Sequence, residues 1–215
     1  MQRSRRAFGF TMIEMVVTMT IFAILVALGV PAMTTWIRNN KVRAVTDSLQ
    51  TGLRLAQAES LRRSRQVVFS LTNSTTPDTI LPLPAVAGGT SWAIWTVPSM
   101  TDNTEPLTFI QSGVLSNASS GVQVTSTNNT INDVSTVCFN SMGRLVNNAS
   151  ANVIAITGGD SCVQPSVGTP PVLKFNISMT GADRPLQINL GLGGQVHMCD
   201  PGVPISDAHP EGCPP

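Results

Sequence analysis

The sequence is short of the groups that most enzymes use. It contains only two histidines, His197 and His209, and both lie close to the last two cysteines. A Ser-His-Asp set needs a histidine beside a recognisable nucleophile, and no nucleophile motif occurs in the chain. Phosphate-binding loops and dinucleotide fingerprints are missing as well. The sequence therefore predicts a protein that is not an enzyme and that uses no cofactor.

Acidic residues are missing from the first nine positions, which carry Arg3, Arg5 and Arg6. A basic flank ahead of an apolar segment stays on the cytoplasmic side of a membrane. The segment that follows, residues 10–30, has about the 20 residues needed to cross a bilayer, and its only charge is Glu14. We therefore predict a single pass through a membrane, with the rest of the chain outside the cytoplasm.

A cleaved secretory signal or a plain signal anchor would begin in a similar way. A secretory signal has small residues at a cleavage site after its apolar region, whereas residues 30–36 read Val-Pro-Ala-Met-Thr-Thr-Trp. A plain anchor has no use for a carboxylate, which costs roughly 2.5–3.5 kcal/mol inside a spanning helix. We therefore expect Glu14 to have a partner.

Residues 9–14, Gly-Phe-Thr-Met-Ile-Glu, resemble the processing site of the type IV pilin-like superfamily. The resemblance implies that a prepilin peptidase cuts after Gly9 and that the new first residue, Phe10, is methylated. It also implies that Glu14 pairs with the freed amine of a neighbouring subunit, because each buried charge then relieves the other's desolvation cost. Pro31 matches the helix-kinking proline of the family.

The resemblance and the apolar pattern together divide the chain into a leader at residues 1–9, a long helix at 10–65 and a β-rich head at 66–215. Residues 10–31 are the transmembrane part of the helix. The second half of the helix is amphipathic and needs a partner surface. Its apolar stripe consists of Trp36, Ile37, Val42, Val45, Leu49, Leu53, Ala56 and Leu61.

The apolar period changes to two from residue 66 onward, which is typical of strands with one wet and one buried face. Strands are predicted at residues 67–71, 92–97, 107–111, 122–125, 134–139, 153–157, 172–178, 186–190 and 195–199. We therefore expect an α+β type IV pilin fold, in which the amphipathic half of the long helix packs on an antiparallel β-sheet head with disulfides.

All four cysteines, Cys138, Cys162, Cys199 and Cys213, lie in the head. An even number of cysteines outside the cytoplasm indicates disulfides, with three possible pairings. We favour Cys138 with Cys162 and Cys199 with Cys213, because each pair closes a short loop. A zinc site made by two of the cysteines and the two histidines is the alternative, but oxidised thiols would leave only the histidines as ligands. We therefore predict no metal.

Residues 141–144, Ser-Met-Gly-Arg, read as a hairpin turn. Together with the two residues before them, as Phe-Asn-Ser-Met-Gly-Arg at 139–144, they resemble a segment of the GspH/FimT branch of the superfamily. Some members of this branch bind DNA through a Gly-Arg-x-Arg motif. The matching residues here are Gly-Gln-Val-His at 194–197, so both arginines are replaced. Arg62, Arg63 and Arg65 form the remaining basic cluster, which also suits the C-terminal end of a helix.

The charge of the head also argues against DNA as a partner. From residue 66 onward, three basic residues stand against nine acids, so the head should repel a polyanion. The basic residues are Arg144, Lys174 and Arg184, and the acids are Asp78, Asp102, Glu105, Asp133, Asp160, Asp183, Asp200, Asp207 and Glu211.

The resemblance implies a non-catalytic minor pilin near the tip of a type IV pilus, where it helps to initiate assembly. Its expected partners are other minor and major pilins, the prepilin peptidase, the inner membrane and the pilus assembly platform. Its expected place is the inner membrane, with a periplasmic head, and then the filament. The alternatives are a minor pseudopilin H of a type II secretion system and a DNA-binding minor pilin for natural transformation.

Overall fold

A computed structural model of the protein describes residues 9–76, 81–98, 105–115, 120–128, 131–165 and 171–214. The chain divides into two compact units, residues 1–37 and residues 38–215, and we describe each by itself. The first element is a single helix, α1 (Met12–Arg63), which lies within the predicted helical span. The helix assignment includes residue 31, but the side chain of Pro31 lies outside the described part, so the kink there stays a prediction.

Two five-stranded sheets make up the head, and all but one of the predicted strands are confirmed. Sheet 1 has the order β3-β2-β1-β5-β6, with every neighbouring pair antiparallel. Its strands are β1 (Gln66–Thr72), β2 (Ser91–Val97), β3 (Thr108–Val114), β5 (Thr136–Phe139) and β6 (Leu145–Val146).

Sheet 2 has the order β10-β9-β8-β7-β4 and is antiparallel except that β10 runs parallel to β9. Its strands are β4 (Val122–Thr127), β7 (Val172–Met179), β8 (Leu186–Gly191), β9 (Val196–Pro204) and β10 (Gly212–Cys213). The short strands β6 and β10 are absent from the prediction, since two residues give no periodic signal.

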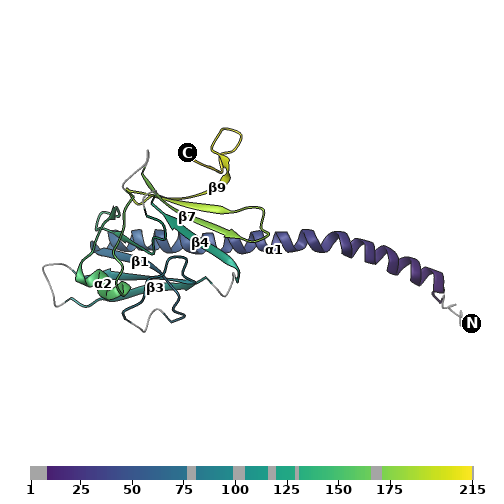
Figure 1. Ribbon diagram of the computed structural model, residues 1–215, viewed down its shortest axis with the longest axis horizontal. Helices are drawn as coiled ribbons and strands as arrows, with labels where there is room; N and C mark the ends of the chain where they lie inside the picture. The colour runs from purple at the N-terminus through teal and green to yellow at the C-terminus, as the bar shows by residue number, and fades with distance from the viewer. Residues whose placement is uncertain are drawn as a thin grey trace, which may run out of the picture. The chain divides into compact units, whose positions relative to one another are not determined.

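The main core of the head forms where both sheets pack against the second half of α1 (Figure 1). The middle of the predicted stripe is buried there, at Val42, Val45, Leu49, Leu53 and Ala56. The ends of the stripe are not: Trp36, Ile37 and Leu61 are 65%, 45% and 51% exposed. The stripe prediction is wrong at these positions because burial is limited to helix residues that face the strands.

The central strands of sheet 1, β1, β2 and β5, are buried on both faces, which the prediction of one wet face missed. The second face of the sheet packs against the short helix α2 (Ala151–Thr157) in a separate core that includes Trp95 and Cys138. The strand predicted at residues 153–157 is therefore wrong, because the segment is helical. Its apolar side chains Val153 and Ile156 follow helical spacing, and Gly158 ends the helix in the left-handed conformation, with φ of 74°.

The turn predicted at residues 141–144 is confirmed between β5 and β6. Gly143 has a positive φ of 71°, and its N–H donates to the carbonyl oxygen of Asn140 over 2.8 Å. A second tight turn, at residues 191–195, joins β8 to β9 and has Gly194 at φ of 86°. The N–H of Leu145 donates to the carbonyl oxygen of Leu192, so the two sheets meet at these turns.

Candidate functional site

The predicted processing site lies where α1 begins. Gly9 and Phe10 precede the helix, and Phe10 is 78% exposed. The eight residues before them, including Arg3, Arg5 and Arg6, lie outside the described part of the chain. The peptide bond after Gly9 therefore lies outside the helix, between two exposed residues.

Thr11 caps the first turn of α1, and the sequence analysis missed this role. The N–H of Glu14 donates to the hydroxyl oxygen of Thr11 over 3.3 Å, and the N–H of Met15 donates to the carbonyl oxygen of Thr11. The signal was present in the sequence, since Thr-x-x-Glu is the capping-box pattern at a helix start. The cap places the Glu14 carboxylate in the first turn of the helix, where a negative charge is favourable.

The apolar part of α1 after Glu14 is exposed along its length. Side chains that a soluble protein would bury are between 42% and 74% exposed after Glu14, from Val26 at the lower end to Leu28 at the upper end. By length and composition, α1 is the one helix among the described residues that could cross a membrane. Its apolar surface fits either lipid or the helices of neighbouring subunits.

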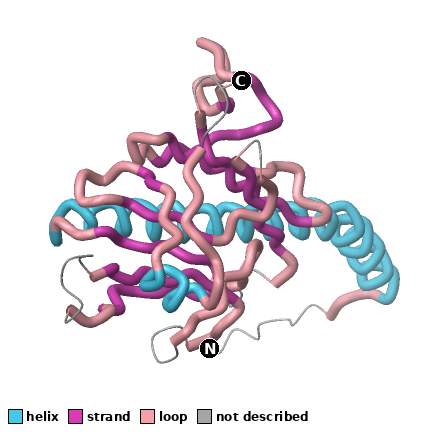
Figure 2. Tube along the Cα trace, turned by 60° about the vertical axis from the view of Figure 1, so that its left-hand side comes forward, coloured by secondary structure: helices cyan, strands magenta, loops and turns pink. Residues whose placement is uncertain are grey.

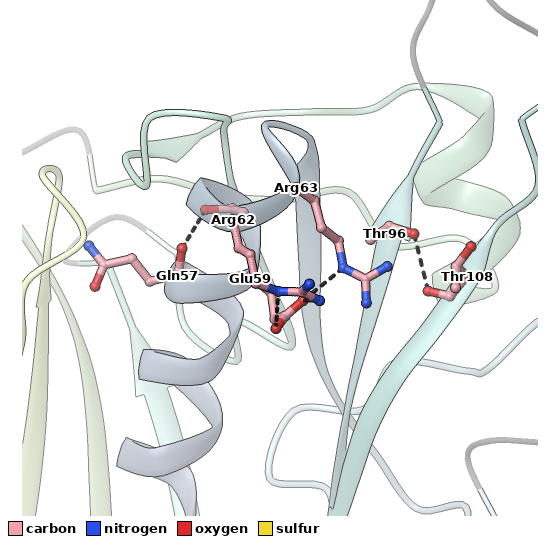
Figure 3. A network of polar contacts seen from close by, with 7 residues as sticks. Gln57, Glu59, Arg62, Arg63, Thr96 and Thr108 are labelled. Atoms are coloured by element: carbon pink, nitrogen blue, oxygen red, sulfur yellow. Dashed lines mark hydrogen bonds and ion pairs between the residues drawn. The ribbon is translucent and has the colours of Figure 1, made fainter.

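The basic cluster at the end of α1 is paired with acids, and Figure 3 shows Arg62 and Arg63 beside Glu59. Arg62 and Arg63 both contact the Oε2 atom of Glu59, at 2.6 and 2.7 Å, and Arg65 lies 3.2 Å from Glu105. Hydrogen bonds from Arg62, which has the larger effect, and from Arg63 lower the pKa of Glu59 from 4.5 to about 2. These ion pairs offset part of the positive charge that a phosphate backbone would need.

The segment that matches the DNA-binding motif forms the end of the β8–β9 turn and the start of β9. Gln195, in the turn, and His197, in the strand, are both exposed. Neither residue is a permanent cation. The structure therefore brings no arginine to the positions that the motif requires.

Two disulfides join the cysteines in the pairing that we favoured from the sequence. The Cys138–Cys162 bond links β5 to the segment after α2 and is buried in the second core. The Cys199–Cys213 bond ties β9 to β10 and closes the last loop of the chain. With every cysteine oxidised, the zinc site considered above loses its thiolate ligands.

These features define a class of protein: an exposed apolar helix that starts at a processing motif and continues into a disulfide-bonded β head. The family model "Prokaryotic N-terminal methylation motif" matches residues 4–30, and the model "Type II transport protein GspH" matches residues 45–190. The second match covers more than half of the chain. The protein belongs to the GspH family of minor pilins and pseudopilins, which are membrane-anchored subunits with a periplasmic head.

Similar solved structures come from both kinds of system. The type IV minor pilin FimU of Pseudomonas aeruginosa is 14% identical, with 78% of this chain and 95% of that chain covered and a TM-score of 0.47. The minor pseudopilin EpsH from the type 2 secretion system of Vibrio cholerae is 10% identical, with 76% and 99% covered and a TM-score of 0.45. No curated protein sequence matches the chain. The family assignment rests on the two family models.

Proposed function

We propose that this protein is a minor pilin of a type IV pilus, a filament subunit near the tip that helps to initiate assembly. The observation that carries the proposal is the N-terminal half of α1, which presents an exposed apolar surface directly after the methylation motif. A surface of this kind needs either lipid or other helices around it, and a pilin uses both in turn. The head is then free to contact other subunits.

Maturation would follow from the geometry at the start of the helix. Prepilin peptidase would remove the leader, residues 1–9, and methylate the new terminus at Phe10. The remaining chain would keep residues 10–31 in the inner membrane, within the helix of residues 10–65, and the head of residues 66–215 in the periplasm. On extraction by the assembly platform, Glu14 would pair with the terminal amine of a neighbouring pilin, and Pro31 would allow the helix to bend.

The choice of a pilus rests on the C-terminal loop. The Cys199–Cys213 disulfide supports a loop in which almost every residue is exposed, and it stands out from the head in Figure 2. A rigid, exposed loop suits specific contacts with other subunits, because little conformational entropy is lost on binding. The second candidate is a pseudopilin of a type II secretion system, which the description of the matched family favours.

Deletion of the gene in its own organism separates the two candidates. For a minor pilin, we expect the number of surface pili to fall sharply while the set of secreted proteins stays the same. For a pseudopilin, exported proteins would accumulate in the periplasm and pili would remain. Complementation with the intact gene, and with the gene of the Glu14→Ala variant, provides the controls. Unchanged pili together with unchanged secretion would contradict both candidates.

A further inference from the structure

The exposed apolar surface of α1 continues past the predicted end of the membrane span at residue 31. Beyond that end, Met33, Trp36 and Ile37 are 62%, 65% and 45% exposed. No charged residue occurs in the sequence between Glu14 and Arg38. A continuous apolar surface of this kind marks contact with a membrane or with protein, so the part of the helix that needs such a contact is longer than the predicted span.

The distance between Glu14 and Trp36 matches the thickness of the apolar interior of a bilayer. Their separation of 22 residues in the sequence corresponds to about 33 Å along a helix axis at 1.5 Å per residue. The hydrocarbon core of a bilayer is about 30 Å thick, and a helix tilt of about 20°, the average for spanning helices, accommodates the difference. The two residues can therefore lie at opposite edges of the core at the same time.

Each of these two residues has the chemistry that its edge of the core favours. A carboxylate is costly inside hydrocarbon, and at the level of the lipid headgroups it stays hydrated. Tryptophan is enriched at that level, because its ring is apolar and its indole N–H finds a hydrogen-bond acceptor there. Arg38 follows Trp36 after one residue and begins the charged part of the helix, which suits the water beyond the headgroups.

Two threonines between these edges have their hydroxyl groups bonded within the helix. The hydroxyl of Thr18 donates to the carbonyl oxygen of Met15 over 3.0 Å, and the hydroxyl of Thr20 donates to the carbonyl oxygen of Val17 over 2.8 Å. A polar group that is hydrogen-bonded in this way can enter an apolar surrounding at a much smaller cost than an unpaired one. The two threonines therefore do not oppose the placement of this segment in hydrocarbon.

We propose that, before assembly, Trp36 contacts the lipid headgroups on the periplasmic side of the membrane while Glu14 lies among the headgroups on the cytoplasmic side. Residues 15–35 then cross the hydrocarbon core, and residues 10–31 all lie inside the membrane when its headgroup layers are counted. The bond after Gly9 lies on the cytoplasmic side of Glu14. Because the carboxylate stays hydrated there, the cost of burying it arises only on assembly, when an amine of a neighbouring subunit can pair with it.

Tryptophan fluorescence measures this depth on the full-length chain. Trp36 is exposed, whereas Trp92 and Trp95 are buried in the head at 4% and 5% exposure, so subtraction of the Trp36→Phe signal isolates Trp36. The protein is reconstituted into vesicles of phosphatidylcholine and phosphatidylglycerol, in which the acyl chains of the phosphatidylcholine carry bromine either near the headgroup or near the methyl end. We expect bromine near the headgroup to quench Trp36 severalfold more strongly than bromine near the methyl end.

Two added tryptophans on the same helix serve as matched controls. Ile13 and Leu25 are 72% and 63% exposed, and Leu25 is 11 residues away from both Glu14 and Trp36 in the sequence. Leu25→Trp should show the reverse preference, because position 25 would lie at the centre of the bilayer. Ile13→Trp should behave like Trp36, because it lies next to Glu14. For both variants the wild-type signal is subtracted, so that Trp36 stays in place.

A hydrocarbon core limited to residues 10–31 would give a different pattern. Trp36 would then lie in water, where acrylamide reaches it and neither brominated lipid does. That result, or quenching of Trp36 mainly by bromine near the methyl end, would overturn the proposal. Protection of Trp36 from acrylamide and from both lipids would show that protein covers it, and would overturn the proposal as well. The measurement needs no filament, so its failure would leave the proposed function untouched.

Discussion

Gln57 of α1 donates a hydrogen bond from Nε2 to the backbone carbonyl oxygen of Gly143, 3.1 Å away. This bond fixes the β5–β6 turn of sheet 1 to the helix. Gly194, in the β8–β9 turn of sheet 2, packs against the same two groups. A Cβ atom on Gly194 would lie 2.1 Å from the oxygen of Gly143 and 2.3 Å from Nε2 of Gln57. The contact between helix and sheets therefore leaves no room for a side chain at position 194.

Gly194→Ala should consequently destabilise the head. The substitution combines an unfavourable positive φ with a clash against backbone, and we expect it to lower the free energy of unfolding by about 2–4 kcal/mol. Gly121→Ala is the matched control, because its φ of 93° is similar but its nearest neighbour is the flexible end of Met179, at 3.3 Å. Urea denaturation of the full chain in detergent measures both. Equal losses would show that the clash contributes nothing.

Glu59 should make the stability of the head depend on pH at the acidic end. Its pKa of about 2 in the folded state lies below its ordinary value of 4.5, so the stabilisation is complete above 4.5 and is lost as the pH falls toward 2. Glu59→Gln should therefore cost about 1 kcal/mol at pH 7 and low salt. Below about pH 2 the difference between the variant and the wild type should disappear.

Unfolding measured between pH 2 and 7 checks this expectation. Asp47→Asn is the control, since the Arg43–Asp47 pair is 3.9 Å long and its side chains are 69% and 53% exposed. We expect a smaller effect from that substitution at every pH. A constant difference between wild type and Glu59→Gln down to pH 2 would contradict the role of the arginines in lowering the pKa.

The two disulfides should differ in what they stabilise. Replacement of Cys138 and Cys162 by alanine opens a loop with a sequence separation of 24 and leaves space in the second core, so we expect a loss of about 3–5 kcal/mol. The same change at Cys199 and Cys213 should mainly release the C-terminal loop. Proteolysis should then cut within residues 200–212 while the rest of the head resists. A larger global loss from the second pair would contradict this division.

Glu14→Ala should separate processing from assembly. We expect the variant to be cleaved like the wild type, because Gly9 and Phe10 are unchanged, but to enter filaments at least about tenfold less well, because an unpaired buried charge costs about 3–5 kcal/mol. Thr18→Ala, one turn further along the same exposed helix, should assemble normally. Western blots of sheared filaments and of membranes measure both steps. Full incorporation of Glu14→Ala would show that the charge pair is not required.

The sequence was sufficient where one residue or one clear period decides the structure. The apolar run, Glu14 and the stripe between Val42 and Ala56 predicted the long helix and its buried face, and Gly143 predicted the turn after β5. The short loops between cysteines favoured the pairing that the structure has. In each case the signal is local and has few competing explanations.

The sequence was insufficient where tertiary contacts decide. The run at residues 153–157 contains enough apolar residues for a strand or a helix. The helix is explained by a tertiary contact, because Val153 and Ile156 pack in one core with Trp95 and Cys138 of sheet 1. The division into two sheets depends on pairings between distant segments, such as β4 with β7, which no local period reports. The pairing of Glu59 with Arg62 and Arg63 was also missed, although the spacing of three and four residues permits it.

The mass of the mature protein recovered from sheared surface filaments tests the central claim most directly. We predict a chain that begins at Phe10, carries one additional N-terminal methyl group and retains both disulfides. The Gly9→Leu variant should remain uncut in the membrane and be absent from the filaments. A protein that is missing from filaments of pilus-bearing cells, or that starts at Met1 or after residue 30, would contradict the account.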